Sequence, residues 1–151
     1  MKKLRLATGI LLSIILLFCS TSCQNLIDEL EIKGYTYGLS EIENDNVALY
    51  NSAANGHFSY EFIFANSGND VTRKIVTGED EVETTPGTFS IYRDRLELTF
   101  QEERVTLSYN KKTGKLTGLI NLPKIDEDGN FVSGRSVLVK ASFVAIIKMG
   151  D

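Results

Sequence analysis

The stretch "HFSYEFIFAN", residues 57–66, alternates aromatic side chains with smaller or polar ones. Successive side chains of a β-strand point to opposite faces, so residues two apart share a face. One face of this stretch therefore gathers aromatic rings, while Ser59 and Glu61 belong to the other face. The pattern predicts a half-buried strand whose aromatic face belongs to a core. The residues of that face are Phe58, Tyr60, Phe62 and Phe64.

The same alternation recurs toward the C-terminus. "GTFSIYRDRLELTF" (87–100) predicts two strands on either side of Arg93-Asp94, and "RVTLSY" (104–109) and "KLTGLINL" (115–122) predict one strand each. The inward-facing residues of these strands are expected to be Phe89, Ile91, Leu96, Leu98, Phe100, Val105, Leu107, Tyr109, Leu116, Ile120 and Leu122.

The longest run, "SVLVKASFVAIIKM" (136–149), is apolar on both faces of its C-terminal half. A strand with two apolar faces is typically covered on both sides, so we expect such cover here. Weaker strand patterns occur in "GYTYGL" (34–39), "NVALY" (46–50) and "VTRKIVT" (71–77).

Short connections join the predicted strands. Asn55-Gly56 and Asp128-Gly129 can adopt positive φ at low cost, and Gly114 supplies the left-handed residue of the loop "NKKTGK". About eight or nine strands with short connections predict an all-β fold in which sequence neighbours pair as antiparallel hairpins. An up-and-down meander of this kind closes into a barrel without exposed edges, and a β-sandwich is the alternative.

The N-terminus has the organisation of a secretory signal peptide. "MKKLR" is basic, "LATGILLSIILLF" (6–18) is apolar, and "STSC" (20–23) supplies small residues before a cysteine. The apolar run is shorter than the roughly 20 residues that span a bilayer. We therefore expect a signal peptide over 1–22, an anchor cysteine with a polar spacer over 23–33, and one barrel domain over 34–151.

This segment resembles a bacterial lipoprotein signal, in which an acylated cysteine becomes the first mature residue. Ser22 before Cys23 fits that pattern, whereas Phe18 before Cys19 does not. The resemblance implies that fatty acyl chains such as palmitate on Cys23 anchor the protein to a membrane. It also implies a place in the bacterial cell envelope, at the outer membrane, on its periplasmic or surface face.

The segments "NGHFSYEFIFANSGNDVTRKIVTG" (55–78) and "GTFSIYRDRLELTF" resemble small bacterial lipocalin-like lipoproteins. The resemblance covers about residues 55 to 100 and implies a calycin-type β-barrel. A barrel of this size is either packed solid or holds one ligand. If it holds one, Phe58, Tyr60, Phe62 and Phe64 are the candidate contacts for a small apolar molecule. The alternative is a protein-interaction module with a solid core, either an envelope assembly subunit or an enzyme inhibitor.

Charge and motifs argue against several other functions. The whole chain carries a net charge of −4, and without residues 1–22 it has 13 cations against 20 acids. Such an acidic body does not suit nucleic-acid binding. His57 is the only imidazole, and nucleophile-elbow, Walker and dinucleotide motifs are absent from the sequence.

Two acidic stretches are interpreted as turns. "DEDGN" (126–130) lacks the spacing of an EF-hand loop and predicts a hairpin turn, and "GEDEVE" (78–83) predicts a solvated loop. A metal site built from cysteine and histidine lacks enough ligands in this chain. We therefore expect no catalytic residues, no metal and no cofactor.

Overall fold

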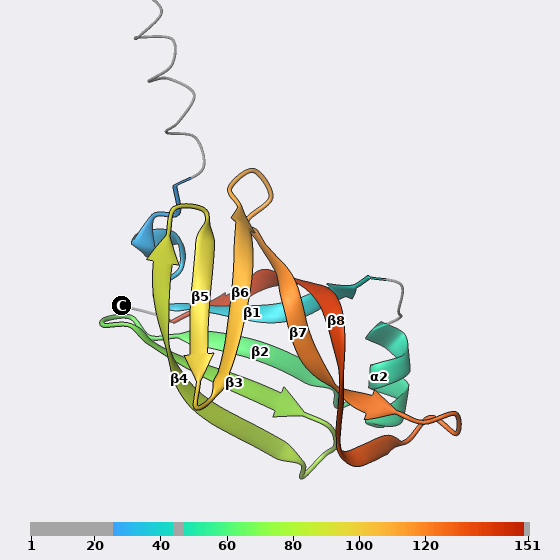
Figure 1. Cartoon of the computed structure of the whole chain (residues 1–151). Coiled ribbons are helices and arrows are strands. Elements are labelled where there is room, and N and C mark those ends of the chain that lie inside the picture. Colours follow the sequence, from blue (N-terminus) through green and yellow to red (C-terminus); the bar gives the residue numbers. More distant parts are fainter. Residues whose placement is uncertain (1–25, 44–46, 150–151) are drawn as a thin grey trace, which may run out of the picture.

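A computed structural model describes residues 26–43 and 47–149 of the chain. Over these residues eight antiparallel strands form a closed up-and-down barrel with one short α-helix (Figure 1). This confirms the all-β meander barrel that the sequence predicts, and it is consistent with the lipocalin-like resemblance. The elements are η1 (Glu29–Glu31), β1 (Tyr35–Ile42), α2 (Val47–Ala53), β2 (Ser59–Phe64), β3 (Asp70–Val76), β4 (Val82–Tyr92), β5 (Arg95–Phe100), β6 (Glu103–Asn110), β7 (Lys115–Ile125) and β8 (Phe131–Lys148).

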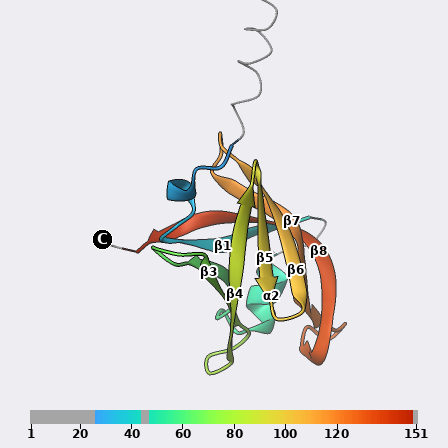
Figure 2. The same ribbon diagram turned by 60° about the vertical axis from the view of Figure 1, so that its left-hand side comes forward.

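Strand β8 closes the barrel by pairing with both neighbours. Its first part pairs with β7, from Phe131 opposite Ile125 onward, and its last part pairs with β1 as far as Lys148 opposite Tyr35. An 18-residue strand that serves two partners must curve around the barrel, as Figure 2 shows. Register shifts in the β1–β8 ladder accommodate this bend. Every strand thus has two partners, and the sheet has no open edge.

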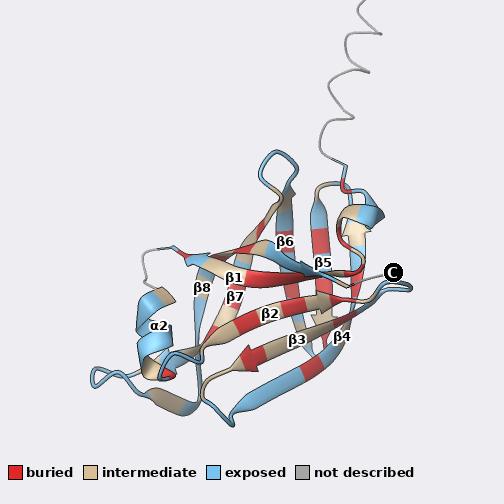
Figure 3. Cartoon of the chain, turned by 180° about the vertical axis from the view of Figure 1, so that it is seen from behind, coloured by how far each residue is buried: buried red, intermediate tan, exposed pale blue. Residues whose placement is uncertain are grey.

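The inward faces of the strands fill the barrel with apolar side chains. Tyr60, Phe62 and Phe64 are each no more than 1% exposed, as the alternation predicts. The Phe62 ring centroid lies 4.9 Å from that of Phe143 and 6.0 Å from that of Phe100. In Figure 3 the buried residues run across the strands, whereas the hairpin ends are largely exposed. The predicted inward residues that are also buried are Phe89, Leu96, Leu98, Phe100, Val105, Leu107, Leu116, Ile120 and Leu122.

The prediction of a strand at "NVALY" is wrong, because these residues begin helix α2. Tyr50 and Ala54, four positions apart, are both buried, which is helical spacing. The helix ends at Ala53, and the turn after it has positive φ at Asn55 (52°) and Gly56 (86°). Among the described residues no helix is long and apolar enough to cross a membrane.

The prediction that the C-terminal half of β8 is covered on both sides is also wrong. Ile146 is 50% exposed and Ile147 is 59% exposed. The two residues are adjacent, and the ladder with β1 shifts register there, between Thr36 opposite Ile147 and Tyr37 opposite Ala145, so both side chains reach solvent near the end of the strand.

The stretch before β1 closes one end of the barrel. Ile32 is fully buried and Ile27 is 8% exposed, so both side chains belong to the core. Asp28 and Glu31 form a capping box around η1, and the Tyr37 hydroxyl donates to the carbonyl oxygen of Glu31 at 3.0 Å. The part of the expected spacer that the structure describes is therefore packed onto the barrel.

Replacing Phe62 with alanine tests the inward face of β2. The change removes a fully buried ring from the aromatic cluster, so we expect a loss of about 3–5 kcal/mol in the free energy of unfolding. Glu61→Ala on the opposite face should cost less than about 1 kcal/mol. Urea denaturation of both variants measures these values. The reverse ranking would contradict the register described here.

Candidate functional site

The end of the barrel opposite η1 is the mouth, which we define as helix α2 with the hairpins β3–β4, β5–β6 and β7–β8. The β5–β6 hairpin is short, since β5 has 6 residues and β6 has 8. The flanking strands β4 and β7 have 11 residues each. The β3–β4 and β7–β8 hairpins therefore extend past the β5–β6 hairpin, toward the bottom and the right of Figure 1.

The barrel also loosens between β6 and β7 on the mouth side. Their ladder runs from Asn110 opposite Lys115 to Leu107 opposite Gly118, although both strands continue beyond that pair. Gly118 itself lies against β6, because a Cβ there would sit 2.3 Å from the carbonyl oxygen of Thr106. Beyond this contact the two strands diverge, and side chains rather than backbone bridge them.

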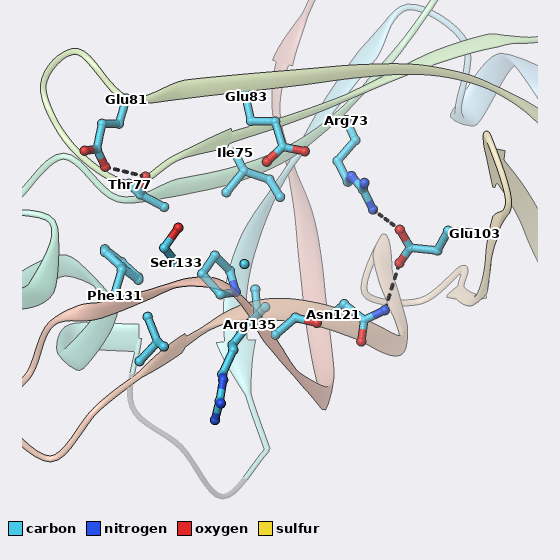
Figure 4. A pocket seen from close by; sticks show the side chains of 15 residues that line it. Arg73, Ile75, Thr77, Glu81, Glu83, Glu103, Asn121, Phe131, Ser133 and Arg135 are labelled. Carbon is cyan, nitrogen blue, oxygen red and sulfur yellow. Dashed lines mark hydrogen bonds and ion pairs between the residues drawn. The ribbon is translucent and has the colours of Figure 1, made fainter.

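A cavity of about 650 Å³ lies at the mouth, between the β3–β4 hairpin and the first half of β8 (Figure 4). Its volume is in the range of small-molecule sites. The wall combines apolar and charged side chains. The main lining residues are Arg73, Ile75, Glu81, Glu83, Glu103, Asn121, Leu122, Pro123, Phe131 and Arg135.

Arg73 is a cation inside the barrel. It stands between Val71 and Ile75 on the inward face of β3, and its side chain is 11% exposed. Its Nη1 donates to Oε2 of Glu103 at 2.5 Å, and its guanidinium lies 4.9 Å from the centroid of the Phe100 ring. Burial disfavours the charged form, but the hydrogen bond and the charge of Glu103 outweigh burial and raise the pKa of Arg73.

Glu103 joins this arginine to the far side of the cavity. Its second carboxylate oxygen, Oε1, accepts from Nδ2 of Asn121 at 3.1 Å. This hydrogen bond connects β6 to β7 where their ladder has ended. Figure 4 shows that this bond and the bond from Arg73 end on the two oxygens of the Glu103 carboxylate. The Glu103 side chain is 28% exposed, so the ion pair lies at the boundary between the core and the cavity.

Two polar atoms beside this pair are buried without a hydrogen-bond partner among the described residues: the Tyr60 hydroxyl and Nε of Arg73. Burial raises the pKa of Tyr60 to about 12, because the phenolate would be desolvated. The nearby charge of Arg73 opposes part of this rise, although the two groups form no hydrogen bond of standard geometry. Buried polar groups without a hydrogen-bond partner are uncommon in folded proteins, so the interior beside the Arg73–Glu103 pair is unusual in this respect.

The four aromatic candidates from the sequence fall in three different places. Phe62 and Phe64 lie in the core, and Tyr60 lies beside Arg73. Phe58 is partly buried and packs between α2 and β8, with ring centroids 5.0 Å from Tyr50 and 6.2 Å from Phe131. Cys23, the predicted lipidation site, lies outside the described residues.

Three ionised side chains of the cavity wall were not predicted from the sequence, although the strand pattern indicates them. We call Arg73, Glu83 and Glu103 the charged wall. In "VTRKIV" the alternation places Arg73 on the same face as two buried apolar residues. Glu103 likewise shares a face with Val105 and Leu107, and Glu83 shares one with Thr85 and Phe89. Charges of opposite sign on the inward faces of a barrel can pair across its interior, so the pattern indicates an internal ion pair even though β3 and β6 are not neighbours in the sheet.

The three hairpins of the mouth are strongly acidic. The turns between their strands (77–81, 101–102 and 126–130) hold seven acids and no cation. In the β7–β8 turn, Oδ1 of Asp126 accepts from the backbone N–H of Asp128 and of Asn130, so "DEDGN" is a turn as predicted. The seven acids are Glu79, Asp80, Glu81, Glu102, Asp126, Glu127 and Asp128.

Comparisons of this chain with models of protein families, with curated proteins and with solved structures found no match. The function is therefore inferred from the site and the sequence.

Because burial raises the pKa of Tyr60, we expect the free energy of unfolding to fall at high pH. An unfolded tyrosine ionises near pH 10, whereas folded Tyr60 has a pKa of about 12. The folded state holds the phenolic proton more tightly than the unfolded state does. The contribution of Tyr60 to the free energy of unfolding is therefore complete below pH 10 and is lost as the pH rises toward 12. Tyr60→Phe should reduce the fall in unfolding free energy over that range by about 2–3 kcal/mol.

Denaturation at a series of pH values measures the effect. Tyr92→Phe is the matched control, since Tyr92 is 65% exposed and its surroundings change little on unfolding. An identical pH dependence in wild type and Tyr60→Phe would show that Tyr60 is not held neutral by burial.

Proposed function

We propose that this chain is a lipid-anchored protein of the bacterial cell envelope whose barrel binds a small molecule at its mouth. The anchor is supported by the basic N-terminus, the apolar run 6–18 and the small residues before Cys23. Acyl chains contribute about 0.8 kcal/mol per buried methylene, and two or more chains hold a protein stably on a bilayer. Binding rather than catalysis is proposed because His57, the single imidazole, is exposed before β2 and is not among the residues that line the cavity.

The observation that carries the binding proposal is the Arg73–Glu103–Asn121 network on the wall of the cavity. Replacing a buried ion pair with apolar residues is often neutral or stabilising, so such a pair is weak evidence for a purely structural role. Charged groups that converge on a concave site, next to apolar walls, are typical of ligand recognition.

The charges favour a cationic ligand with an apolar part. Arg73 is engaged by Glu103, whereas Glu81 and Glu83 line the β3–β4 side of the cavity and the Arg135 side chain points away from them in Figure 4. The acidic hairpins around the mouth add a negative potential that concentrates cations. Ile75, Leu122 and Phe131 supply an apolar wall. We therefore propose an amine-bearing amphiphile in place of the wholly apolar ligand expected from the aromatic strand.

A second candidate function is recognition of a basic protein. The observation that favours it is the excess of acids on the β3–β4 and β7–β8 hairpins, which extend past their neighbours. Complementary charge steers association and suits an inhibitor or assembly subunit. On this account the partner covers the hairpins and the cavity needs no small molecule.

Binding of octylammonium chloride tests the ligand class. We expect wild type to bind this probe, and to bind sodium octanoate of the same chain length several-fold more weakly, because the negative charges of Glu81 and Glu83 repel the carboxylate of octanoate. The double change Glu81→Gln and Glu83→Gln should weaken octylammonium binding several-fold. Isothermal titration calorimetry provides the affinities.

Glu97→Gln is the control, since Glu97 is exposed on the outer face of β5 and its loss changes the net charge but not the cavity. Equal affinity for octanoate and octylammonium would refute the cationic class. Absence of binding by either probe, together with capture of a basic protein partner, would favour the second candidate.

Metabolic labelling with an alkyne fatty acid tests the anchor. Wild type should incorporate the label and Cys23→Ala should not, because the thiol of Cys23 is the proposed attachment point. Cys19→Ala is the matched control and should label as wild type does. Equal labelling of wild type and Cys23→Ala would exclude lipidation at this residue.

A further inference from the structure

The closed end of the barrel has a surface that differs from the mouth. We define the anchor face as the exposed residues Leu26, Leu30, Tyr92, Arg93, Lys111 and Lys112. Leu30 is 78% exposed, Tyr92 is 65% exposed and Leu26 is 50% exposed, which is unusual for large apolar side chains gathered in one region. Figures 1 and 2 both place η1 beside the β4–β5 and β6–β7 turns, at the end away from the β3–β4 and β7–β8 hairpins.

This face is tied firmly to the start of the described chain. The backbone N–H of Ile27 donates to the carbonyl oxygen of Arg93 at 2.8 Å, which joins the N-terminal stretch to the β4–β5 turn. Glu31 lies 3.8 Å from Lys111, which joins η1 to the β6–β7 turn. The chain therefore enters the barrel at the anchor face.

We propose that the anchor face rests on the membrane surface and that the mouth points away from it. The proposal rests on the lipid anchor at Cys23. Leu26 lies three positions after Cys23, and an extended chain covers at most about 3.5 Å per residue. Leu26 then lies within about 10 Å of the acylated residue, which restricts the orientations open to the barrel.

The distribution of charge favours the same orientation. The β4–β5 and β6–β7 turns carry Arg93, Arg95, Lys111, Lys112 and Lys115 against the single acid Asp94. The stretch 28–33 adds Asp28, Glu29 and Glu31 against Lys33, so this end carries six cations and four acids in all. Anionic lipid attracts this end and repels the acidic hairpins of the mouth.

The apolar residues of the anchor face suit the interface as well. Tyrosine is enriched at the level of lipid headgroups, where its ring is apolar and its hydroxyl remains hydrated. Leu26 and Leu30 can insert shallowly beside it. With the mouth directed away, the cavity takes its ligand from the aqueous phase and not from the membrane that holds the protein.

Fluorescence quenching in vesicles tests this orientation. The full chain, processed in a bacterial host, is reconstituted into vesicles of phosphatidylcholine and phosphatidylglycerol in equal amounts. One sample carries a bimane label at Leu30→Cys on the anchor face, and the other carries it at Ser133→Cys, which is exposed on β8 at the mouth. A nitroxide on the lipid headgroup is the quencher, and we expect several-fold stronger quenching at position 30.

Flotation of the same vesicles separates the two levels of the proposal. Protein that does not float with the lipid overturns both the anchor and the orientation. Protein that floats but shows equal quenching at the two positions, or stronger quenching at position 133, overturns the orientation and leaves the anchor in place. The change Lys111→Glu with Lys112→Glu should weaken quenching at position 30, whereas Glu97→Lys on the outer face of β5 should not weaken it.

Discussion

The pairing of β1 with β8 is the constraint on which the rest of the structure depends. It closes the sheet, so each strand turns one face to a single shared interior. That interior must be filled densely, and the aromatic face of β2 supplies much of the volume around Phe62. Closure also means that a charge placed on an inward face cannot reach solvent through the wall. It must find a partner inside, as Arg73 does in Glu103.

The two ends of the barrel differ in the side chains that fill them. At one end Ile27 and Ile32 plug the interior, and η1 is held by its capping box and by the Tyr37 hydroxyl. At the other end a short β5–β6 hairpin and the divergence of β6 from β7 leave space that charged side chains line. The core is therefore solid in the middle, and a cavity of about 650 Å³ lies at the mouth.

Much of the fold could be predicted from the sequence, because a half-buried strand has a period of two that single residues reveal. The inward residues of β2, β5, β6 and β7 follow that period closely. Helix α2 could not be distinguished from a strand, since "NVALY" is too short for its helical spacing to show. The exposure of both Ile146 and Ile147 depends on the register shift in the β1–β8 ladder, which periodicity does not reveal. Arg73 and Glu103 lie 30 positions apart on β3 and β6, which are not neighbours in the sheet, so their contact depends on closure of the barrel, and neither strand periodicity nor a known motif predicts it.

The central claim is that the charged mouth cavity of this barrel holds a small molecule. Native mass spectrometry of the protein extracted in mild detergent from its own host tests it most directly. The account predicts a species whose mass exceeds that of the acylated chain by one small ligand, and this species should be lost at raised collision energy. It also predicts loss of that species in the variant that carries both Glu81→Gln and Glu83→Gln. A spectrum containing the acylated chain alone under the gentlest conditions would contradict the claim.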